Sequence, residues 1–276
     1  MQDRVWFITG ATSGFGLSLA TAVLARGERA VVAGRRADRL QVLAAPFADR
    51  ALPIALDVTD AAAREGAVKQ ALARFGRIDV LANIAGRGSL GAVEEFAPLQ
   101  LREQMEINFF AAAGLTRAVL PAMRAQGSGH ILNLTSIGGL VSVAGFGPYC
   151  AAKFALEAWS EALAGEVAPF GIRVTLIEPG AFRTEFAGDV NMRPATRIDA
   201  YRPVIQPVED YLYGSAGTQP GDPDKAAALM IEAVDSPTPP LRLMMGADAF
   251  GMWDTILAAR QADLNAWRAR GIATAF

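Results

Sequence analysis

The sequence is poor in the residues that build disulfide frameworks and metal centres. Its 276 residues include one cysteine, Cys150, and one histidine, His130. A single cysteine forms no internal disulfide and is compatible with a reducing cytoplasm, and a single histidine offers no cluster of metal ligands. We therefore expect a cytoplasmic protein without a metal site, in which His130 is structural and Cys150 is a small buried residue.

Excess charge and long apolar runs are also lacking. The formal net charge is -2, which argues against a nucleic-acid partner because such a partner requires a basic face. No apolar run is long enough to span a bilayer, and Met1 to Arg4 lead directly into an apolar run, so we expect neither a membrane partner nor a signal peptide. With 52% hydrophobic residues, the chain can bury one sizeable core. The expected partner is a small molecule.

Short apolar runs alternate with stretches of helical periodicity along the chain. Continuous apolar strands separated by helices are typical of a parallel sheet covered on both faces, with ligands at the carboxyl edge of the strands. The sequence therefore predicts a single α/β domain, 1–276, with a Rossmann-type, doubly wound parallel sheet of about seven strands. The expected strands are Val5–Ile8, Ala30–Ala33, Leu52–Leu56, Ile78–Ala82, His130–Leu134, Ile172–Ile177 and Leu241–Met245.

A glycine-rich turn joins the first expected strand to the first expected helix. The turn contains Gly10, Gly14 and Gly16 and is followed by apolar residues at helical spacing. Glycine permits positive φ and carries no Cβ, so a pyrophosphate can approach the N–H groups at the positive end of the helix. The turn therefore predicts a dinucleotide site. The alternative is a tight turn that binds nothing.

A second motif pairs a phenol with an ammonium group. Tyr149 and Lys153 are four residues apart in a stretch of helix-forming residues, so both side chains lie on one face of the helix. An adjacent cation favours the phenolate and lowers the pKa of tyrosine from about 10, which allows proton transfer near neutrality. The hydroxyl of Ser136 would then hold a substrate oxygen against the phenol. The alternative is chance spacing on an amphipathic helix with a solvated lysine.

In this order and separation, the two motifs resemble those of the short-chain dehydrogenase/reductase family, specifically its compact single-domain branch. The resemblance extends from about Arg4 to about Thr184. Residues 83–86 are similar to the family's Asn-Asn-Ala-Gly element, with Ile84 in place of the second asparagine, and Asn108 matches the asparagine of its catalytic tetrad. The arrangement is also similar to the members that resemble 17β-hydroxysteroid dehydrogenases.

The resemblance implies an activity and a set of site residues. Hydride transfer to a carbonyl builds negative charge on the oxygen, which a proton or a fixed donor must meet. By this analogy Tyr149 supplies the proton and Ser136 orients the oxygen. Lys153 stabilises the tyrosinate and binds the nicotinamide ribose, and Asn108 holds a water that links Lys153 to solvent. The residues expected to bind the cofactor are Gly10, Thr12, Ser13, Gly14, Phe15, Gly16, Arg35, Arg36, Asp57, Val58, Asn83, Ala85, Gly86, Tyr149, Lys153, Pro179, Gly180, Phe182 and Thr184.

The end of the second expected strand favours NADP(H). An acidic residue there would bind the ribose hydroxyls and repel a 2′-phosphate, whereas arginine clamps that phosphate. Gly34 stands where NAD-dependent members of the family carry the acid, and two arginines follow it. We expect Arg35 to be the main phosphate partner, Arg36 to stack on adenine, and Asp57 to accept from the amino group of adenine. The alternative is that the arginines are solvent-facing residues at a helix start.

Two segments are expected to shape the substrate site. Residues 182–221 lack regular periodicity and contain several aromatic residues and prolines, so we expect a substrate lid with a short helix or two. Its aromatic residues favour an apolar or aromatic ketone, or they only fix the loop to the core. Residues 247–276 are expected to form an amphipathic C-terminal helix that closes the pocket, packs on the core or meets a second subunit.

Three functions are compatible with the sequence. The leading one is an NADPH-dependent carbonyl reductase, reversible as a secondary-alcohol dehydrogenase. The second is a redox-silent NADP(H)-sensing or scaffold protein on the same fold, and the third is a nicotinamide-dependent epimerase or dehydratase. The family is commonly dimeric or tetrameric, so we expect a homo-oligomer formed through helices that start near Leu99 and Tyr149.

Overall fold

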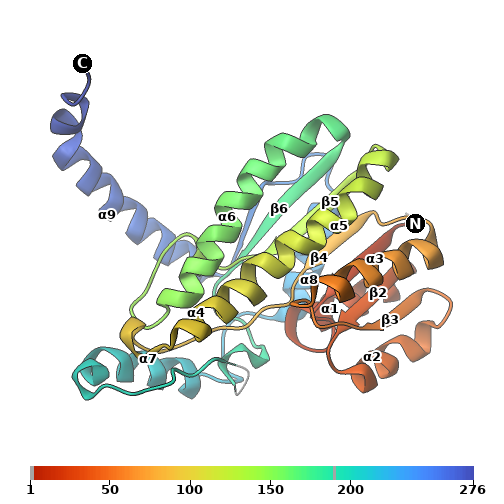
Figure 1. Ribbon diagram of the computed structural model, residues 1–276, viewed down its shortest axis with the longest axis horizontal. Coiled ribbons are helices and arrows are strands. Elements are labelled where there is room, and N and C mark those ends of the chain that lie inside the picture. The colour runs from red at the N-terminus through yellow and green to blue at the C-terminus, as the bar shows by residue number, and fades with distance from the viewer. Residues whose placement is uncertain (1–2, 189–190) are drawn as a thin grey trace.

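The computed structural model describes residues 3–188 and 191–276, so Met1, Gln2 and positions 189 and 190 of the expected lid lie outside it. Within the described residues, one seven-stranded parallel sheet has the order β3-β2-β1-β4-β5-β6-β7 (Figure 1). The predicted doubly wound sheet is therefore confirmed. The strands are β1 (Val5–Thr9), β2 (Arg29–Gly34), β3 (Ala51–Ala55), β4 (Val80–Asn83), β5 (Gly129–Leu134), β6 (Ile172–Pro179) and β7 (Arg242–Met245).

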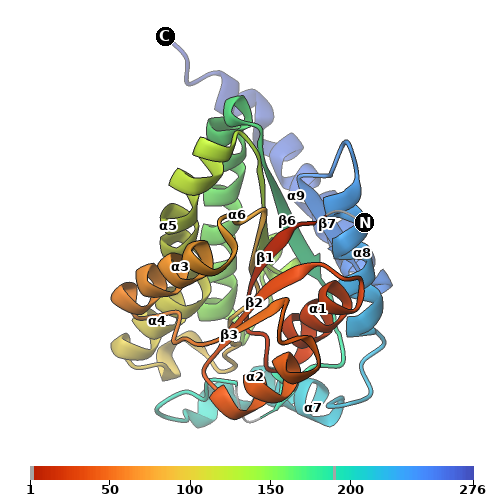
Figure 2. The same cartoon turned by 90° about the vertical axis from the view of Figure 1, so that its right-hand side faces the viewer.

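Helices cover both faces of this sheet (Figure 2). One face packs against α1, α2 and α8, and the other packs against α3, α5 and α6. The α-helices are α1 (Gly14–Ala25), α2 (Ala37–Ala44), α3 (Ala61–Phe75), α4 (Pro98–Met105), α5 (Ala111–Gln126), α6 (Gly147–Val167), α7 (Arg202–Gly214), α8 (Pro223–Asp235) and α9 (Ala247–Ile272).

Strand β1 shows why its sequence is apolar throughout. Trp6 and Ile8 belong to the core on the α1 side, whereas Val5 and Phe7 belong to the core on the α3 side. This alternation is the two-residue period of a strand. Burying each of these large side chains contributes about 1.5–3 kcal/mol. A strand covered on both faces therefore reads as one continuous apolar run.

The order of the strands creates a switch point beside β1. The chain adds β2 and β3 on one side of β1, then returns to place β4 on the other side. In such sheets the crevice at the carboxyl ends of the strands binds ligands. Thr9 holds the two loops at this point together, because its Oγ1 accepts hydrogen bonds from the backbone N–H groups of Ile84 (2.9 Å) and Ala85 (3.1 Å).

His130 lies in β5 and is buried, as expected of a structural residue. Its Nε2 is 2.9 Å from the Oγ1 of Thr175 on the neighbouring strand β6. Burial lowers the pKa of the imidazole to about 4, because the charged form loses its hydration. The side chain therefore stays neutral near neutrality and links two central strands.

The expected lid contains helical structure. Short 3₁₀ turns occupy Glu185–Ala187 and Asp199–Tyr201, and α7 follows directly. Buried Glu95 fastens this segment to the body, because its carboxylate accepts from the N–H of Ile198 (2.9 Å) and pairs with Arg202 (3.0 Å). The middle of the expected lid, 182–221, is thus tied to the residues that precede α4.

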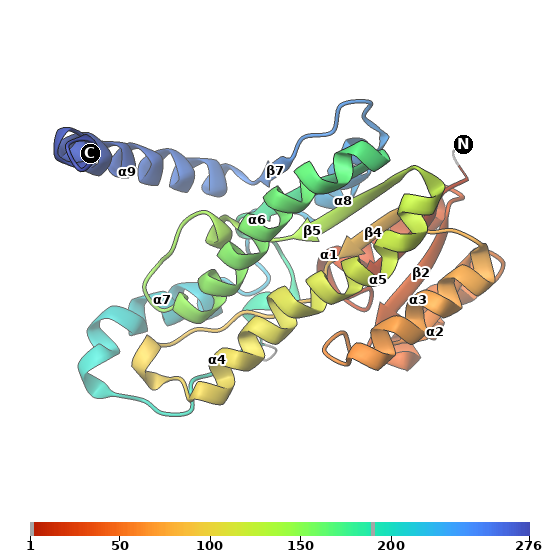
Figure 3. The same ribbon diagram turned by 45° about the horizontal axis from the view of Figure 1, so that its top comes forward.

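The C-terminal helix α9 extends away from the body (Figures 1 and 3). Near its start Ala249 is buried, and Trp253 and Ile256 pack with Ile137 and Val141. Farther along, exposed large apolar residues include Leu257, Leu264 and Trp267. The apolar face of α9 was expected to close the pocket, to pack on the core or to meet a second subunit. Packing on the core is observed, near the N-terminal end of α9 only. Among the described residues, no helix combines the length and apolar character needed to cross a bilayer.

Candidate active site

The glycine turn between β1 and α1 forms an open backbone cradle. Gly10 has φ +67°, a conformation that residues with a Cβ rarely adopt. A Cβ at Gly16 would overlap with the carbonyl oxygen of Gly10, so glycine lets the helix start directly against the turn. The cradle presents the N-terminus of α1 to the switch point, which is the geometry that binds a pyrophosphate. These residues therefore fit a dinucleotide.

The arginines after β2 differ in what they contact. Arg35 is exposed and lies close enough to Asp57 to lower the pKa of that carboxyl, although hydrogen bonds from Thr59 are the larger cause. Arg36 donates to the Oγ1 of Thr12 (2.9 Å) and to its backbone oxygen (3.1 Å). The guanidinium of Arg36 is thus held against the glycine turn, where sequence analysis had it stacking on adenine.

A lid residue joins the same arginines. The carboxylate of Glu185 pairs with Arg36 and with Arg39, each at 3.3 Å, and it also interacts with the hydroxyl of Ser13. Burial raises the pKa of Glu185, but Arg36 and these hydrogen bonds outweigh it and keep the pKa below its usual value. The carboxylate of Glu185 therefore lies at the start of α1, among guanidinium and hydroxyl groups of the kind that bind anions.

The turn after β4 brings only some of its predicted cofactor-binding residues to the site. The Nδ2 of Asn83 donates to Asn133 (2.8 Å) and Thr116 (3.1 Å) inside the core, so this side chain joins β4, β5 and α5. The amide thus satisfies its buried hydrogen bonds inside the core, and the cofactor contact expected of Asn83 stays a prediction. Gly86, by contrast, lies beside the catalytic candidates. A Cβ there would be 2.6 Å from the Oδ1 of Asn108 and 3.6 Å from the Nζ of Lys153.

Asn108 is buried in a π-helical turn, Glu106–Phe110, that joins α4 to α5. Its Nδ2 donates to the backbone oxygen of Arg87 (2.9 Å) and its Oδ1 accepts from the N–H of Arg87 (3.3 Å). Such turns interrupt α-helices frequently at functional sites. Here the extra residue turns Asn108 toward the loop that carries Gly86.

Ser136, Tyr149 and Lys153 meet at the carboxyl ends of β5 and β6. Ser136 lies two residues beyond the end of β5, and its Oγ accepts from the N–H of Gly138 (3.0 Å) and interacts with the phenol of Tyr149. On α6, Tyr149 is 8% exposed and Lys153 is 3% exposed. The Nζ of Lys153 donates to the backbone oxygen of Leu134 (2.7 Å) and lies 5.8 Å from the centre of the Tyr149 ring.

Burial dominates the ionisation of this pair. It raises the pKa of Tyr149 well above its usual range, and the hydroxyl of Ser136 opposes this only in part. Burial also lowers the pKa of Lys153 to about 7, against an opposing effect of the Glu157 carboxylate. The expected net fall in the pKa of the phenol is therefore not observed, because desolvation penalises both charged forms and dominates at Tyr149. Tyr149 is held as the neutral acid.

Aromatic rings surround the phenol. Phe146, just before α6, and Phe186, in the lid, pack edge-on to Tyr149 with ring centres 6.4 Å and 5.3 Å away. Sequence analysis named Phe182 of the lid for the cofactor, and its ring lies 5.0 Å from that of Phe15 in the glycine turn. The lid therefore covers both the tyrosine and the cradle with apolar side chains.

The loop after β6 carries the remaining predicted cofactor residues. Pro179 ends the strand, and Gly180 leaves room for the carboxylate of Asp248, which accepts from the N–H of Ala181 (2.7 Å). Thr184 packs against Gly14, where an added Cβ would lie 3.1 Å from the threonine side chain. The loop thus runs from the strand edge to the cradle and joins the two ends of the predicted site.

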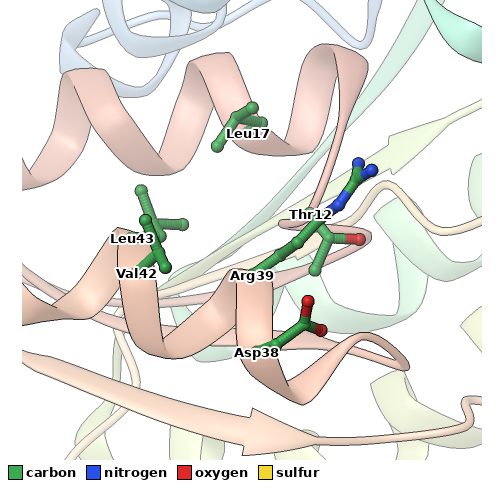
Figure 4. Close-up of a pocket in the computed structure, with 6 residues that line it drawn as sticks. All are labelled: Thr12, Leu17, Asp38, Arg39, Val42 and Leu43. Atoms are coloured by element: carbon green, nitrogen blue, oxygen red, sulfur yellow. The ribbon is translucent and has the colours of Figure 1, made fainter.

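A cavity of about 380 Å³ lies between α1 and α2 (Figure 4). Leu17 faces Val42 and Leu43 across it, and Thr12 and Arg39 line it on the right-hand side of the view. It borders the arginine end of the site rather than Tyr149. In the part of the chain that the structure describes, there is no group of three or more His, Cys, Asp or Glu residues able to hold a metal ion.

A group of charged residues behind Lys153 was not predicted from the sequence. Glu157 and Glu178 are buried, and the Nε of Arg242 lies 3.5 Å and 3.3 Å from their carboxylates. The four-residue spacing from Lys153 could have indicated Glu157. Glu178 could have been noticed as an acid directly after the expected strand Ile172–Ile177.

Comparisons with known proteins agree with this geometry. A family model described as short chain dehydrogenase matches residues 4–195. The chain is 36% identical to oxidoreductase BOA17 of Botryotinia fuckeliana over 275 residues, which is 99% of this chain and 100% of that protein. The crystal structure of a short-chain dehydrogenase from Streptomyces avermitilis is 44% identical, with both chains fully covered and a TM-score of 0.94. An alcohol dehydrogenase from Thermococcus sibiricus, complexed with 5-hydroxy-NADP, is 25% identical, with 88% of this chain and 95% of that chain covered and a TM-score of 0.73.

Proposed function

Because the chain belongs to the short-chain dehydrogenase/reductase family, whose members are oxidoreductases that act with a nicotinamide cofactor, we propose that it is an NADPH-dependent carbonyl reductase, reversible as a secondary-alcohol dehydrogenase. One observation carries the proposal: Ser136, Tyr149 and Lys153 meet at the strand edge, and Asn108 adjoins Lys153 across Gly86. The glycine cradle lies at the same edge. The narrower resemblance to 17β-hydroxysteroid dehydrogenases stays a prediction.

Each residue has a defined part in the proposed reaction. When bound, the reduced nicotinamide supplies hydride to the carbonyl carbon. The neutral phenol of Tyr149 donates its proton to the developing alkoxide, and the hydroxyl of Ser136 donates a hydrogen bond to the same oxygen. Lys153 in its charged form stabilises the tyrosinate that remains. Asn108 would hold the water molecule through which Lys153 exchanges protons with solvent.

The residues that would hold the cofactor lie along one line. The cradle Gly10 to Gly16 would bind the pyrophosphate, and the loop from Pro179 to Thr184 would border the nicotinamide. Lys153 would contact the ribose next to it. At the other end, Asp57 and Val58 would flank adenine, and Arg35 would bind the 2′-phosphate, since this exposed guanidinium is free of the contacts that hold Arg36 against Thr12.

The aromatic rings beside Tyr149 support an apolar or aromatic ketone as substrate. Phe146 and Phe186 present apolar surface next to the reacting hydroxyl, which suits a substrate that has little polar surface near its carbonyl. The expected cytoplasmic location and homo-oligomeric state stay predictions.

The proposed function is tested by mixing the protein with NADPH and a panel of aryl and cyclic ketones. We expect loss of the absorbance of reduced nicotinamide with at least one member of the panel, and formation of the matching secondary alcohol. Binding of NADPH without turnover of any ketone or alcohol would favour the redox-silent alternative. Turnover that consumes no net NADPH would favour an epimerase or dehydratase.

Arg35→Gln is expected to weaken NADPH binding about tenfold, because one charge-assisted contact to the 2′-phosphate is lost. Binding of NADH, which lacks this phosphate, should change less than twofold by the same argument. Fluorescence titration of both cofactors measures the two dissociation constants. Arg124→Gln is the control, because Arg124 is exposed at the end of α5, and it should change neither constant. An equal change for NADPH and NADH would refute the phosphate contact.

A further inference from the structure

Two buried carboxyl groups lie behind Lys153 and have no part in the proposed reaction. Glu157 follows Lys153 by one helical turn on α6 and is 4% exposed. Glu178 lies in β6, directly before Pro179, and is 1% exposed. Isolated acidic residues are almost never this deeply buried, since a buried carboxylate loses its hydration. The pair therefore requires a physical explanation.

The hydrogen bonds around the pair are incomplete if both groups are ionised. Both oxygens of Glu157 and the Oε1 of Glu178 are buried and accept no hydrogen bond from the described residues. The hydroxyl of Thr135 lies beside Glu157 but donates to the backbone oxygen of Ile177 (2.9 Å). Two carboxylates would thus leave several buried acceptors without a donor, which is unfavourable.

The surrounding charges also argue against ionisation of both carboxyl groups. The groups that act on the pair from the surrounding elements are Lys153 and Glu161 on α6 and Arg242 on β7. Arg242 approaches both buried carboxylates only at 3.5 Å and 3.3 Å, and its closest partner is the exposed Glu161 at 2.9 Å. One guanidinium shared among three carboxylates, with the Lys153 ammonium held on the backbone oxygen of Leu134, does not closely pair two buried charges that repel each other.

A single proton removes both problems. The carboxyl groups of Glu157 and Glu178 lie close enough to affect the pKa of each other, so the O–H of one can donate to an oxygen of the other. Burial and the neighbouring Glu157 raise the pKa of Glu178 to about 8, and burial also raises the pKa of Glu157. Desolvation is the largest cause at both positions, and Lys153 favours the negative charge on Glu157 rather than on Glu178, which assigns the proton of the pair to Glu178.

We propose that Glu157 and Glu178 form a carboxyl–carboxylate pair that holds one proton and one negative charge, and that Glu157 is thereby a positioning residue that keeps the ammonium of Lys153 charged. The shared proton is a property of the fold alone. Its consequence for catalysis rests on the proposed role of Lys153.

The direction of the effect follows from the signs of the charges. Burial favours neutral Lys153, and the negative charge on Glu157 favours the ammonium. Replacing Glu157 by glutamine removes that charge, so the lysine loses its proton at a lower pH. Replacing Glu178 by glutamine leaves the charge on Glu157 in place, because an amide imitates the neutral carboxyl group. The two similar substitutions therefore have different expected effects.

The shared proton is tested by infrared spectroscopy of the intact protein with isotope-labelled glutamate carboxyl groups. Near neutral pH we expect the carbonyl stretch of a protonated carboxyl group. This band should disappear in Glu178→Gln, and also in Glu157→Gln, where Glu178 pairs with Arg242 alone and ionises. Glu161→Gln is the control and should keep the band. Absence of the band from the unaltered protein, or its persistence in both variants, would overturn the proposal.

The effect on Lys153 is tested by the pH dependence of kcat/KM for ketone reduction. In Glu157→Gln the loss of activity with rising pH should move down by about one pH unit, the size expected for one nearby charge in a protein. Glu178→Gln should keep the unaltered profile, and so should Glu157→Asp, which retains the charge. An unmoved profile in Glu157→Gln, or the same shift in Glu178→Gln, would contradict the positioning role.

The two measurements separate this inference from the proposed function. If no ketone is turned over, the proposed function fails, whereas the infrared band still decides whether the proton is shared. Thermal unfolding of each variant shows whether it folds. If Glu157→Gln does not fold, Glu178→Gln and Glu157→Asp still decide the matter, since loss of the band in the first and an unmoved profile in the second are both required.

Discussion

Tyr149→Phe is expected to lower kcat for ketone reduction by about 10²–10⁴-fold, the usual contribution of a positioned general acid. Phenylalanine keeps the ring that packs against Phe146 and Phe186 and removes only the hydroxyl. The variant should therefore fold and bind NADPH as the unaltered protein does. Steady-state kinetics and fluorescence titration of NADPH measure the two properties separately.

The neutral state of the phenol makes this prediction specific. Burial holds Tyr149 in its protonated form, so the hydroxyl is available to donate a proton across the neutral pH range. Tyr211→Phe is the matched control, because Tyr211 is exposed on α7, and it should leave kcat unchanged. Activity near that of the unaltered protein in Tyr149→Phe would exclude Tyr149 as the acid.

Lys153→Ala is expected to damage both cofactor binding and turnover. The variant removes the cation that stabilises the tyrosinate and the group proposed to contact the ribose, and it leaves the backbone oxygen of Leu134 without its 2.7 Å donor. We expect kcat to fall by about 10²-fold or more, as for loss of a transition-state donor, and the dissociation constant of NADPH to rise about tenfold.

A second lysine provides the control for this variant. Lys225→Ala changes an exposed lysine at the start of α8 and should alter neither constant. Thermal unfolding must accompany both variants, because Lys153 also fills buried space. If Lys153→Ala folds and keeps both its affinity for NADPH and its turnover, the proposed role of Lys153 is wrong.

Local sequence was sufficient for the parts of the site that depend on one short segment. The glycine turn between a strand and a helix needs only positive φ and close backbone approach, and Gly10 and Gly16 have these properties. The four-residue spacing of Tyr149 and Lys153 needs only a helix, which α6 supplies. Both signals are contained within a few consecutive residues.

Predictions were weaker wherever a side chain could turn in more than one direction. Asn83 follows a strand edge in the sequence, but its amide turns inward to Asn133 and Thr116 because buried donors must find acceptors. Arg36 lies against Thr12 and Glu185, a lid residue 149 positions away. The pKa of Tyr149 depends on how completely the packed helix and lid exclude water. Neither these side-chain contacts nor this pKa can be predicted from the residues adjacent in the sequence.

By itself, the sequence determined the alternation of strands and helices, the parallel sheet and the motifs at its edge, because backbone preferences and apolar periodicity act over short distances. Only the tertiary structure decided that Glu157 on α6 meets Glu178 on β6, that Arg242 on β7 approaches both, and that Lys153 lies in front of them. Contacts of this kind depend on how the helix packs on the sheet. The pKa shifts of these groups come from the loss of water around their charges, which occurs only once the chain has folded.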